Sequence, residues 1–146
     1  MEHVAILKKQ WKLVDKIITG QKTIESRWYL VKTLPWDKIH EDEIVYFKES
    51  GGPVIAKAEV SQVIQYYLTP EKVEELFNNY GERIGIEPNQ LTDFINRFRN
   101  KKYCILVFLK KPRRIEPFYI TKEGFGNATA WISVNNVDSI KLSNGL

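Results

Sequence analysis

The chain has little with which to build covalent cross-links or metal sites. It contains one cysteine, Cys104, and two histidines, His3 and His40. One thiol cannot form an internal disulfide, so nothing in the sequence argues for a secreted protein. Two histidines so far apart do not make the spaced Cys/His set of a metal site. We therefore expect neither a bound metal nor another cofactor.

Long apolar runs and familiar binding motifs are missing as well. No stretch approaches the ~18 consecutive apolar residues that span a bilayer. The first residues, MEHVA, lack the basic and apolar regions of a signal peptide. The chain contains neither a phosphate-binding P-loop nor a dinucleotide-binding glycine motif. These absences predict a cytoplasmic protein that has no membrane partner.

What is present is the composition of a globular protein. The 146 residues are 43% hydrophobic and 27% charged, which is typical of a folded soluble domain. This length suits one compact domain and is too short for two ordinary ones, so we expect a single domain over residues 1–146. The net charge of +4 is compatible with an anionic partner, but a basic surface that only serves solubility is an equal alternative.

Two kinds of apolar periodicity alternate along the chain. Helical spacing predicts helices over residues 9–19, 70–81 and 88–100, the second of them capped by Thr69 and opened by Pro70. Alternating or continuous apolar residues predict short strands over residues 4–8, 22–30, 43–48, 54–66, 103–109, 115–120, 131–134 and 137–142. The expected fold class is α+β, with a small mixed β-barrel or curled sheet flanked by helices.

Residues 20–28, GQKTIESRW, combine cations, a carboxylate and an indole at a helix-to-strand junction. Alternation along the strand places Glu25 and Arg27 on one face, where they can pair. Lys22 follows a helix C-terminus, where the helix dipole favours its positive charge. The two cations could hold a phosphate or polarise a carbonyl, and Trp28 could stack on a base.

The same residues also allow a purely structural interpretation. Glu25 and Arg27 could form an ion pair that closes the sheet, and Trp28 could belong to the core, as most tryptophans do. Three other features remain open in the same way. The basic run 110–114 could contact phosphates or be a solvated loop, the loop 124–127 could be a lid or a hairpin connection, and Tyr66 and Tyr67 could line a cleft or pack.

The pattern Gly20-x-Lys22-x-x-Glu25-x-Arg27, placed after an amphipathic helix, resembles the motif of the ASCH domain family. Residues 39–44 (IHEDEI), 57–60 (KAEV) and 117–131 resemble further parts of that family, so the resemblance covers most of the chain. It implies a β-barrel of the PUA-like superfamily and a partner that is RNA or a nucleotide.

The resemblance also implies two enzymatic alternatives. Some small members hydrolyse the amide of N4-acetylcytidine with a lysine, a threonine and a glutamate, and a metal-dependent ribonuclease activity is attributed to a bacterial relative. The catalytic lysine corresponds to Lys22, whereas Glu25 stands where those members have the nucleophilic threonine. Thr23 is one residue nearer the lysine and is expected to point the other way. The family's glutamate could correspond to Glu71, Glu74, Glu75 or Glu82.

We therefore expect an ASCH-type module that binds RNA, a nucleotide or a nucleoside in a cleft lined by Lys22, Glu25 and Arg27, with Trp28 nearby. The alternative is a hydrolase of a modified nucleoside in which Lys22 and Glu25 are catalytic, or a ribonuclease. The sequence leaves the presence of catalysis and the identity of protein partners open.

Overall fold

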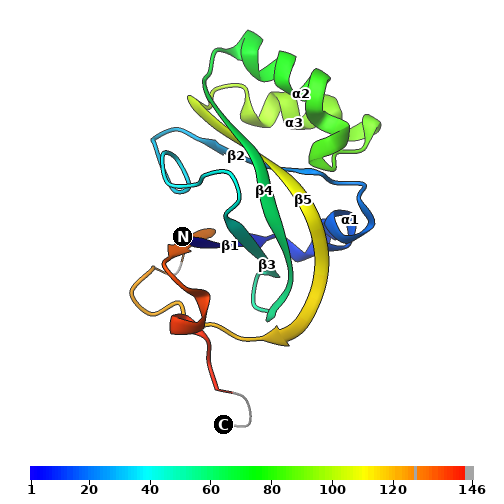
Figure 1. Cartoon of the computed structure of the whole chain (residues 1–146). Coiled ribbons are helices and arrows are strands. Elements are labelled where there is room, and N and C mark those ends of the chain that lie inside the picture. Colours follow the sequence, from blue (N-terminus) through cyan, green and yellow to red (C-terminus); the bar gives the residue numbers. More distant parts are fainter. Residues whose placement is uncertain (127, 144–146) are drawn as a thin grey trace.

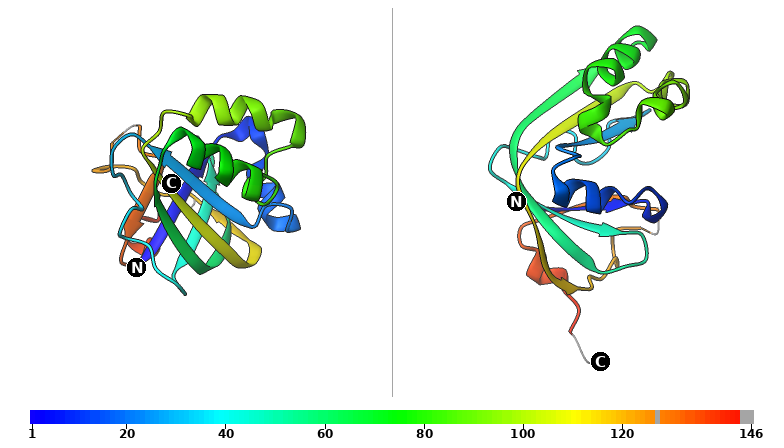
Figure 2. Two further views of the ribbon diagram at one scale, coloured as in Figure 1. Left: turned by 90° about the horizontal axis from the view of Figure 1, so that it is seen from above. Right: turned by 90° about the vertical axis from the view of Figure 1, so that its right-hand side faces the viewer.

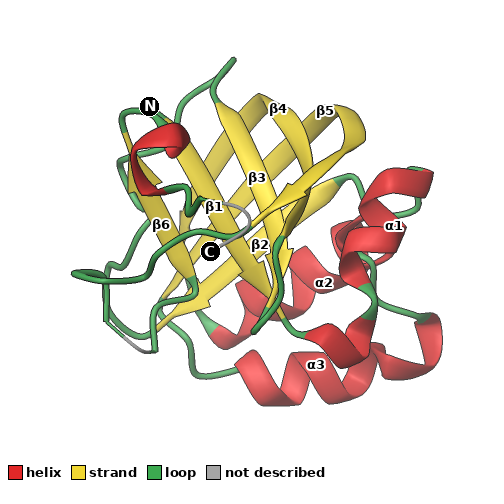
Figure 3. Ribbon diagram, turned by 90° about the horizontal axis from the view of Figure 1, so that it is seen from below, coloured by secondary structure: helices red, strands yellow, loops and turns green. Residues whose placement is uncertain are grey.

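The computed structural model describes residues 1–126 and 128–143. Within them a six-stranded sheet curls into a half-barrel (Figures 1 and 3), with the strand order β2-β5-β4-β3-β1-β6. The strands are β1 (Glu2–Leu7), β2 (Ile24–Tyr29), β3 (Ile44–Glu49), β4 (Val54–Tyr67), β5 (Tyr103–Phe118) and β6 (Trp131–Val134). β1 runs parallel to β3, and the other neighbours are antiparallel.

Helices cover two parts of this sheet. They are α1 (Leu13–Thr19), α2 (Pro70–Ile84) and α3 (Leu91–Phe98), with 3-10 turns η1 (Lys9–Trp11), η2 (Pro88–Gln90) and η3 (Val137–Ile140). Figure 2 shows α1 in the open side of the curl and the α2–α3 pair where β4 ends and β5 begins. The predicted α+β class with a curled sheet and flanking helices is confirmed.

Strand β5 contributes side chains to two hydrophobic cores, one on each face of the sheet. Ile105 and Val107 point into the curl, where they share a core with Phe47 and the α1 residue Ile17. Leu106 belongs to a second core under α2 and α3. A strand buried on both faces reads as a continuous apolar run, as residues 103–109 do.

Two expected elements differ in the structure. The predicted helix over residues 9–19 is split into η1 and α1, because Lys12 between them takes a left-handed conformation with φ 51°. The predicted strand over residues 137–142 is the 3-10 turn η3, whose first turn is capped by the Asn136 side chain accepting from the Asp138 amide. Side-chain capping of this kind competes with strand formation.

β5 also continues through residues 110–114, where the sequence predicted a gap between two strands. β2 pairs with β5 only as far as Phe108, so one edge of β5 is free beyond that point. A missing N–H is tolerated on a free strand edge, and Pro112 and Pro117 lie there. The basic run 110–114 is therefore part of a strand, and two of its cations are paired, Lys110 with Asp42 and Arg114 with Asp15, each at 2.8 Å.

In the part of the chain that the structure describes, no helix combines the length and the apolar character that crossing a membrane requires.

Candidate functional site

A cavity of about 360 Å³ opens beside the free edge of β2. One wall comes from the end of β1, η1 and the start of α1, and the other comes from α2 and α3. Four of its polar lining residues lie on or just before β2: Lys22, Glu25, Ser26 and Arg27. The other polar lining residues are Lys8, Gln90 and Arg97. Its aromatic lining residues are Trp11, Trp28, Tyr29, Phe77, Phe94 and Phe98.

The connection before β2 brings Lys22 into this cavity. Gly20 ends α1 in a left-handed conformation, with φ 82°. The Lys22 amide then donates to Lys16 O at 2.9 Å, and the Thr23 amide donates to Arg83 O at 2.8 Å. These two bonds attach the connection to α1 on one side and to α2 on the other, so the Lys22 side chain enters between the two helices.

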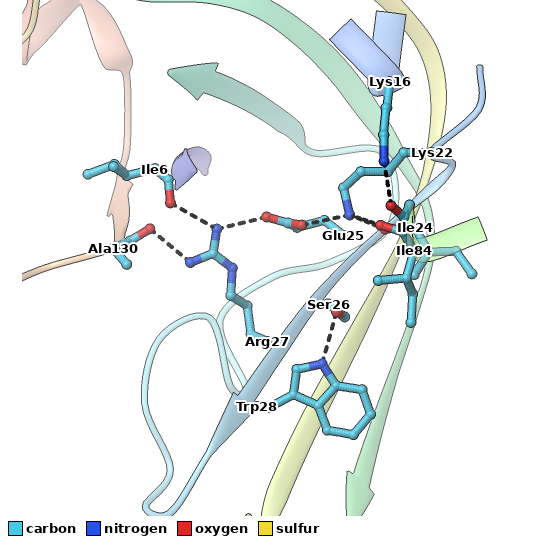
Figure 4. Close-up of polar contacts among 11 residues, drawn as sticks. Ile6, Lys16, Lys22, Ile24, Glu25, Ser26, Arg27, Trp28, Ile84 and Ala130 are labelled. Atoms are coloured by element: carbon cyan, nitrogen blue, oxygen red, sulfur yellow. Dashed lines mark hydrogen bonds and ion pairs between the residues drawn. The ribbon is translucent and has the colours of Figure 1, made fainter. Parts of the chain in front are cut away.

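Lys22 is almost fully buried, with 2% of its surface exposed. Its ammonium donates to Ile24 O at 2.7 Å and to Ile84 O at 2.6 Å, and lies 3.1 Å from Glu25 Oε1 (Figure 4). An ammonium has three N–H donors, so all of them are used by the protein. Burial lowers the pKa of Lys22, and the charge of Glu25 opposes that shift.

Glu25 joins Lys22 to Arg27. Its Oε2 accepts from the Arg27 guanidinium at 2.7 Å, and only 3% of Glu25 is exposed. Burial by itself would raise the pKa of Glu25, but Lys22 and Arg27 together hold it below its usual value. The carboxylate is therefore ionised at neutral pH, between two cations.

Arg27 closes the gap between the two ends of the curl. Its guanidinium donates to Ala130 O at 3.1 Å and to Ile6 O at 3.4 Å (Figure 4). It also lies 5.2 Å from the centre of the Trp131 ring. Side-chain bonds from Arg27 thus join β2 to β1 and to the segment before β6. Alternation along the strand predicted the pairing of Glu25 with Arg27, but it could not predict the contact of Lys22 with Glu25. Lys22 reaches Glu25 because it precedes the strand.

Trp28 is both a core residue and a lining residue of the cavity. Its ring stacks on Phe77, with centroids 4.5 Å apart and an interplanar angle of 11°, and its Nε1 donates to Ser26 Oγ at 2.9 Å. It belongs to the core under α2 and α3 and also contributes to the cavity wall. Both interpretations of Trp28 from the sequence therefore have a structural counterpart.

Two half-buried aromatic residues that contact each other in the cavity wall were not singled out by the sequence pattern. Trp11 of η1 and Phe94 of α3 make an edge contact with centroids 5.7 Å apart. Lys8 lies 4.6 Å from the Trp11 ring, and Arg97 lies 5.2 Å from the Phe94 ring. Helical spacing assigned both aromatics to buried faces. The signal that distinguishes them is a cation three residues away, Lys8 before Trp11 and Arg97 after Phe94.

The remaining candidates lie outside the cavity. Thr23 Oγ1 accepts from Arg83 Nε at 3.0 Å, and Thr23 is not a lining residue. The glutamates considered for a second carboxylate are exposed on α2: Glu71, Glu74, Glu75 and Glu82.

The predicted loop 124–127 does not supply a lid over the cavity from its described residues. Residues 124–126 do not line the cavity, and Asn127 lies outside the described residues. Over residues 1–126 and 128–143, no group of three or more His, Cys, Asp or Glu side chains could hold a metal ion.

No family model and no curated protein sequence matches the chain. Solved structures do. The crystal structure of ASCH from Zymomonas mobilis matches with a TM-score of 0.66 and 18% identity over 94% of this chain and 90% of that chain, and two of its point mutants match with 0.67. The N-terminal domain of Staphylothermus marinus McrB matches with a TM-score of 0.56 and 15% identity, again over 94% and 90%. The chain therefore has the fold of an ASCH domain, as its sequence predicted.

Proposed function

We propose that the cavity binds a nucleoside, either free or as an unpaired nucleotide of an RNA strand. The observation that carries this proposal is the meeting of a buried Lys22–Glu25–Arg27 chain with aromatic walls in a cavity of about 360 Å³. Ligand pockets are commonly apolar with a few fixed polar groups. Unpaired bases are recognised by stacking on aromatic rings and by hydrogen bonds to their edges. The ASCH-type fold supports the same conclusion.

The geometry suggests a division of roles. Trp11 and Phe94, in edge contact with each other, offer a half-buried aromatic surface on which one face of a base would stack. Each Glu25 oxygen already accepts one bond, from Lys22 or from Arg27, and a carboxylate oxygen can accept a second. Glu25 would accept from a ring N–H or an exocyclic amino group. Lys22 would act indirectly, by keeping Glu25 ionised and in position.

Binding without hydrolysis fits these residues better than amide hydrolysis does. The described lining of the cavity contains no threonine, so the nucleophile would be a water activated by Glu25. A carboxylate whose pKa is held low is a weak general base. The bonds that Lys22 donates to two carbonyls stabilise its protonated form. We therefore propose a binding module and keep the hydrolase as the outcome to be tested.

The test is a calorimetric titration with the standard nucleosides and N4-acetylcytidine. At least one of them should bind with one-to-one stoichiometry, and Trp11→Ala should weaken it by about 10- to 100-fold, since stacking on one aromatic contributes roughly 1–3 kcal/mol. Trp11→Phe should retain most of the affinity. Tyr119→Ala, which removes an exposed aromatic that does not line the cavity, is the matched control and should change nothing.

Two results would contradict the proposal. One is that no nucleoside binds to the wild-type protein. The other is release of acetate from N4-acetylcytidine that stops in Glu25→Gln, which would make the protein a hydrolase.

A further inference from the structure

A basic segment runs from the cavity to the neighbouring strand. Residues 97–103, RFRNKKY, connect α3 to β5. Arg97 and Phe98 line the cavity. The Lys101 amide donates to Phe98 O at 3.0 Å, and the Lys102 amide donates to Tyr29 O at 2.8 Å. Because Phe98 and Tyr29 are both lining residues, these bonds attach the segment to the cavity wall at two points.

The positive charge of this segment is not neutralised by nearby carboxylates. Within the described part of the chain, no carboxylate lies within 4.0 Å of a cation of this segment, which are Arg97, Arg99, Lys101 and Lys102. Arg97, Arg99 and Lys102 are exposed. In the other basic run, residues 110–114, two of the four cations have carboxylate partners. The segment beside the cavity is therefore the better site for an anionic partner.

An aromatic cluster continues the same surface. The rings of Trp36, Tyr67 and Tyr103 contact one another edge to face, with centroids 5.2–5.6 Å apart. Lys32 Nζ lies 5.4–5.8 Å from the centres of all three rings. Tyr67 is 69% exposed, so this ring is open to a partner.

The cluster is close to the cavity. Tyr29, Tyr103 and Tyr67 are register neighbours across β2, β5 and β4. Two strand spacings separate Tyr29 from Tyr67, which is about 10 Å. That distance is comparable to one or two steps of an extended single strand of nucleic acid. Cations and an exposed ring at this spacing are what a single-strand binding surface needs.

We propose that this surface binds a single strand of nucleic acid that continues from the nucleotide in the cavity. Arg97, Arg99 and Lys102 contact its phosphates, and a neighbouring base stacks on Tyr67 beside Lys32. The inference deepens the proposed function and rests on it, because it makes the natural ligand a strand and not a free nucleoside. Three exposed cations without carboxylate partners give the charge complementarity to a polyanion.

The test measures the affinity of a nucleoside, a trinucleotide and an octanucleotide, the last as matched RNA and DNA. Affinity should rise with length. Arg99→Gln with Lys102→Gln should weaken the octanucleotide roughly tenfold and reduce the slope of log affinity against log salt by about 1.4, the value for two phosphate contacts to a single strand. Tyr67→Ala should weaken it by a similar factor, while Tyr67→Phe should not. None of these variants should change nucleoside binding.

The matched control is Lys111→Asn with Arg113→Gln, which removes the same charge from the exposed far part of β5. Asparagine suits the left-handed backbone of Lys111, whose φ is 53°. This control should leave the octanucleotide affinity unchanged. Comparing the RNA and DNA octanucleotides shows which kind of strand the protein binds. Arg99→Gln with Lys102→Gln must weaken the binding of that strand.

Each unfavourable result has its own meaning. An octanucleotide that binds no more tightly than the nucleoside, or equally well to both double variants, overturns this inference and leaves the proposed function standing. If the octanucleotide affinity depends on Arg99 and Lys102 but no nucleoside binds, the strand-binding surface is supported. The proposed binding of a nucleoside in the cavity is then overturned. A wild-type protein that binds neither overturns both.

Discussion

At the scale of single residues, the protonation state of His3 follows from its neighbours. His3 is fully buried. His3 Nδ1 lies 2.8 Å from Ser133 Oγ and 3.2 Å from Trp131 Nε1. An indole N–H can only donate and a hydroxyl can either donate or accept, so the neutral form with an unprotonated Nδ1 satisfies both neighbours. His3 Nε2 then donates to Glu43 Oε1 at 2.8 Å. Burial lowers the pKa of His3, and Glu43 only partly opposes this. The N-terminal amine and His40 also face Glu43, at 3.4 and 3.7 Å.

We predict that the free energy of unfolding decreases as the pH falls below 6.5, the ordinary pKa of histidine. The unfolded chain binds a proton there that the folded protein does not bind until its lower pKa is reached. Glu43 does not contribute in this window, because its lowered pKa makes its contribution disappear only below 4.5. Denaturant unfolding from neutral pH to about pH 5 measures the slope.

His3→Gln should flatten this slope, whereas His40→Gln should keep it because His40 is exposed. An unchanged slope in His3→Gln would assign the proton uptake to another group.

At the scale of elements, two helix ends hold the cavity's lysine in place. Gly20 ends α1 with φ 82°, and Gly85 ends α2 with φ 101°. The carbonyl of Gly85 accepts from Lys16 Nζ at 2.8 Å, which joins the two ends. A Cβ at Gly85 would lie 3.3 Å from Lys22 Cδ, whereas a Cβ at Gly20 would meet nothing within 4 Å. The conformation is similar at both positions, but only Gly85 makes room for Lys22.

We predict that Gly85→Ala destabilises the protein more than Gly20→Ala does. Both substitutions carry the strain of a left-handed residue with a Cβ, roughly 1–2 kcal/mol. Gly85→Ala should also displace Lys22 and weaken nucleoside binding, while Gly20→Ala should leave binding unchanged. Denaturant unfolding and calorimetric titration of both variants measure the two effects. Equal losses of stability and unchanged affinity in both would mean that Lys22 adjusts without consequence.

At the scale of the whole molecule, β5 links the two cores and the cavity lies between the two ends of the curl. Cys104 of β5 is fully buried. Burial raises the pKa of its thiol well above the ordinary value. Because the thiolate is the reactive form, a thiol reagent should modify Cys104 only after β5 opens, and opening β5 disrupts both cores and the β2 side of the cavity.

We predict that a nucleoside at about 100 times its Kd slows the labelling of Cys104 by about 100-fold, which corresponds to ~2.7 kcal/mol of stabilisation. The physical reason is that labelling requires global opening, and the ligand binds only the closed protein. The rate of thiol modification under native conditions measures this effect, and the rate in denaturant should be the same with and without ligand. Labelling that the nucleoside does not slow would show that β5 opens without disturbing the cavity.

The sequence by itself determined the features that depend on neighbouring residues. Gly20 ends a helix, Thr69 caps another by accepting from the Lys72 amide, and the apolar run 103–109 forms a strand segment buried on both faces of the sheet. Each of these signals lies within one helical turn or one strand. The curled α+β sheet followed from the order of such segments, and the Glu25–Arg27 pair followed from alternation along one strand.

Only the tertiary structure decided the composition of the cavity. Residues from β1, η1, β2, α2 and α3 line it, and their separation along the chain hides their proximity. Helical spacing treated Trp11 and Phe94 as core, because a periodic pattern identifies an apolar face without showing what covers it. The continuation of β5 past Pro112 depended on where β2 stops pairing. The contact of Lys22 with Glu25 depended on where β2 begins, because side-chain direction alternates only inside the strand.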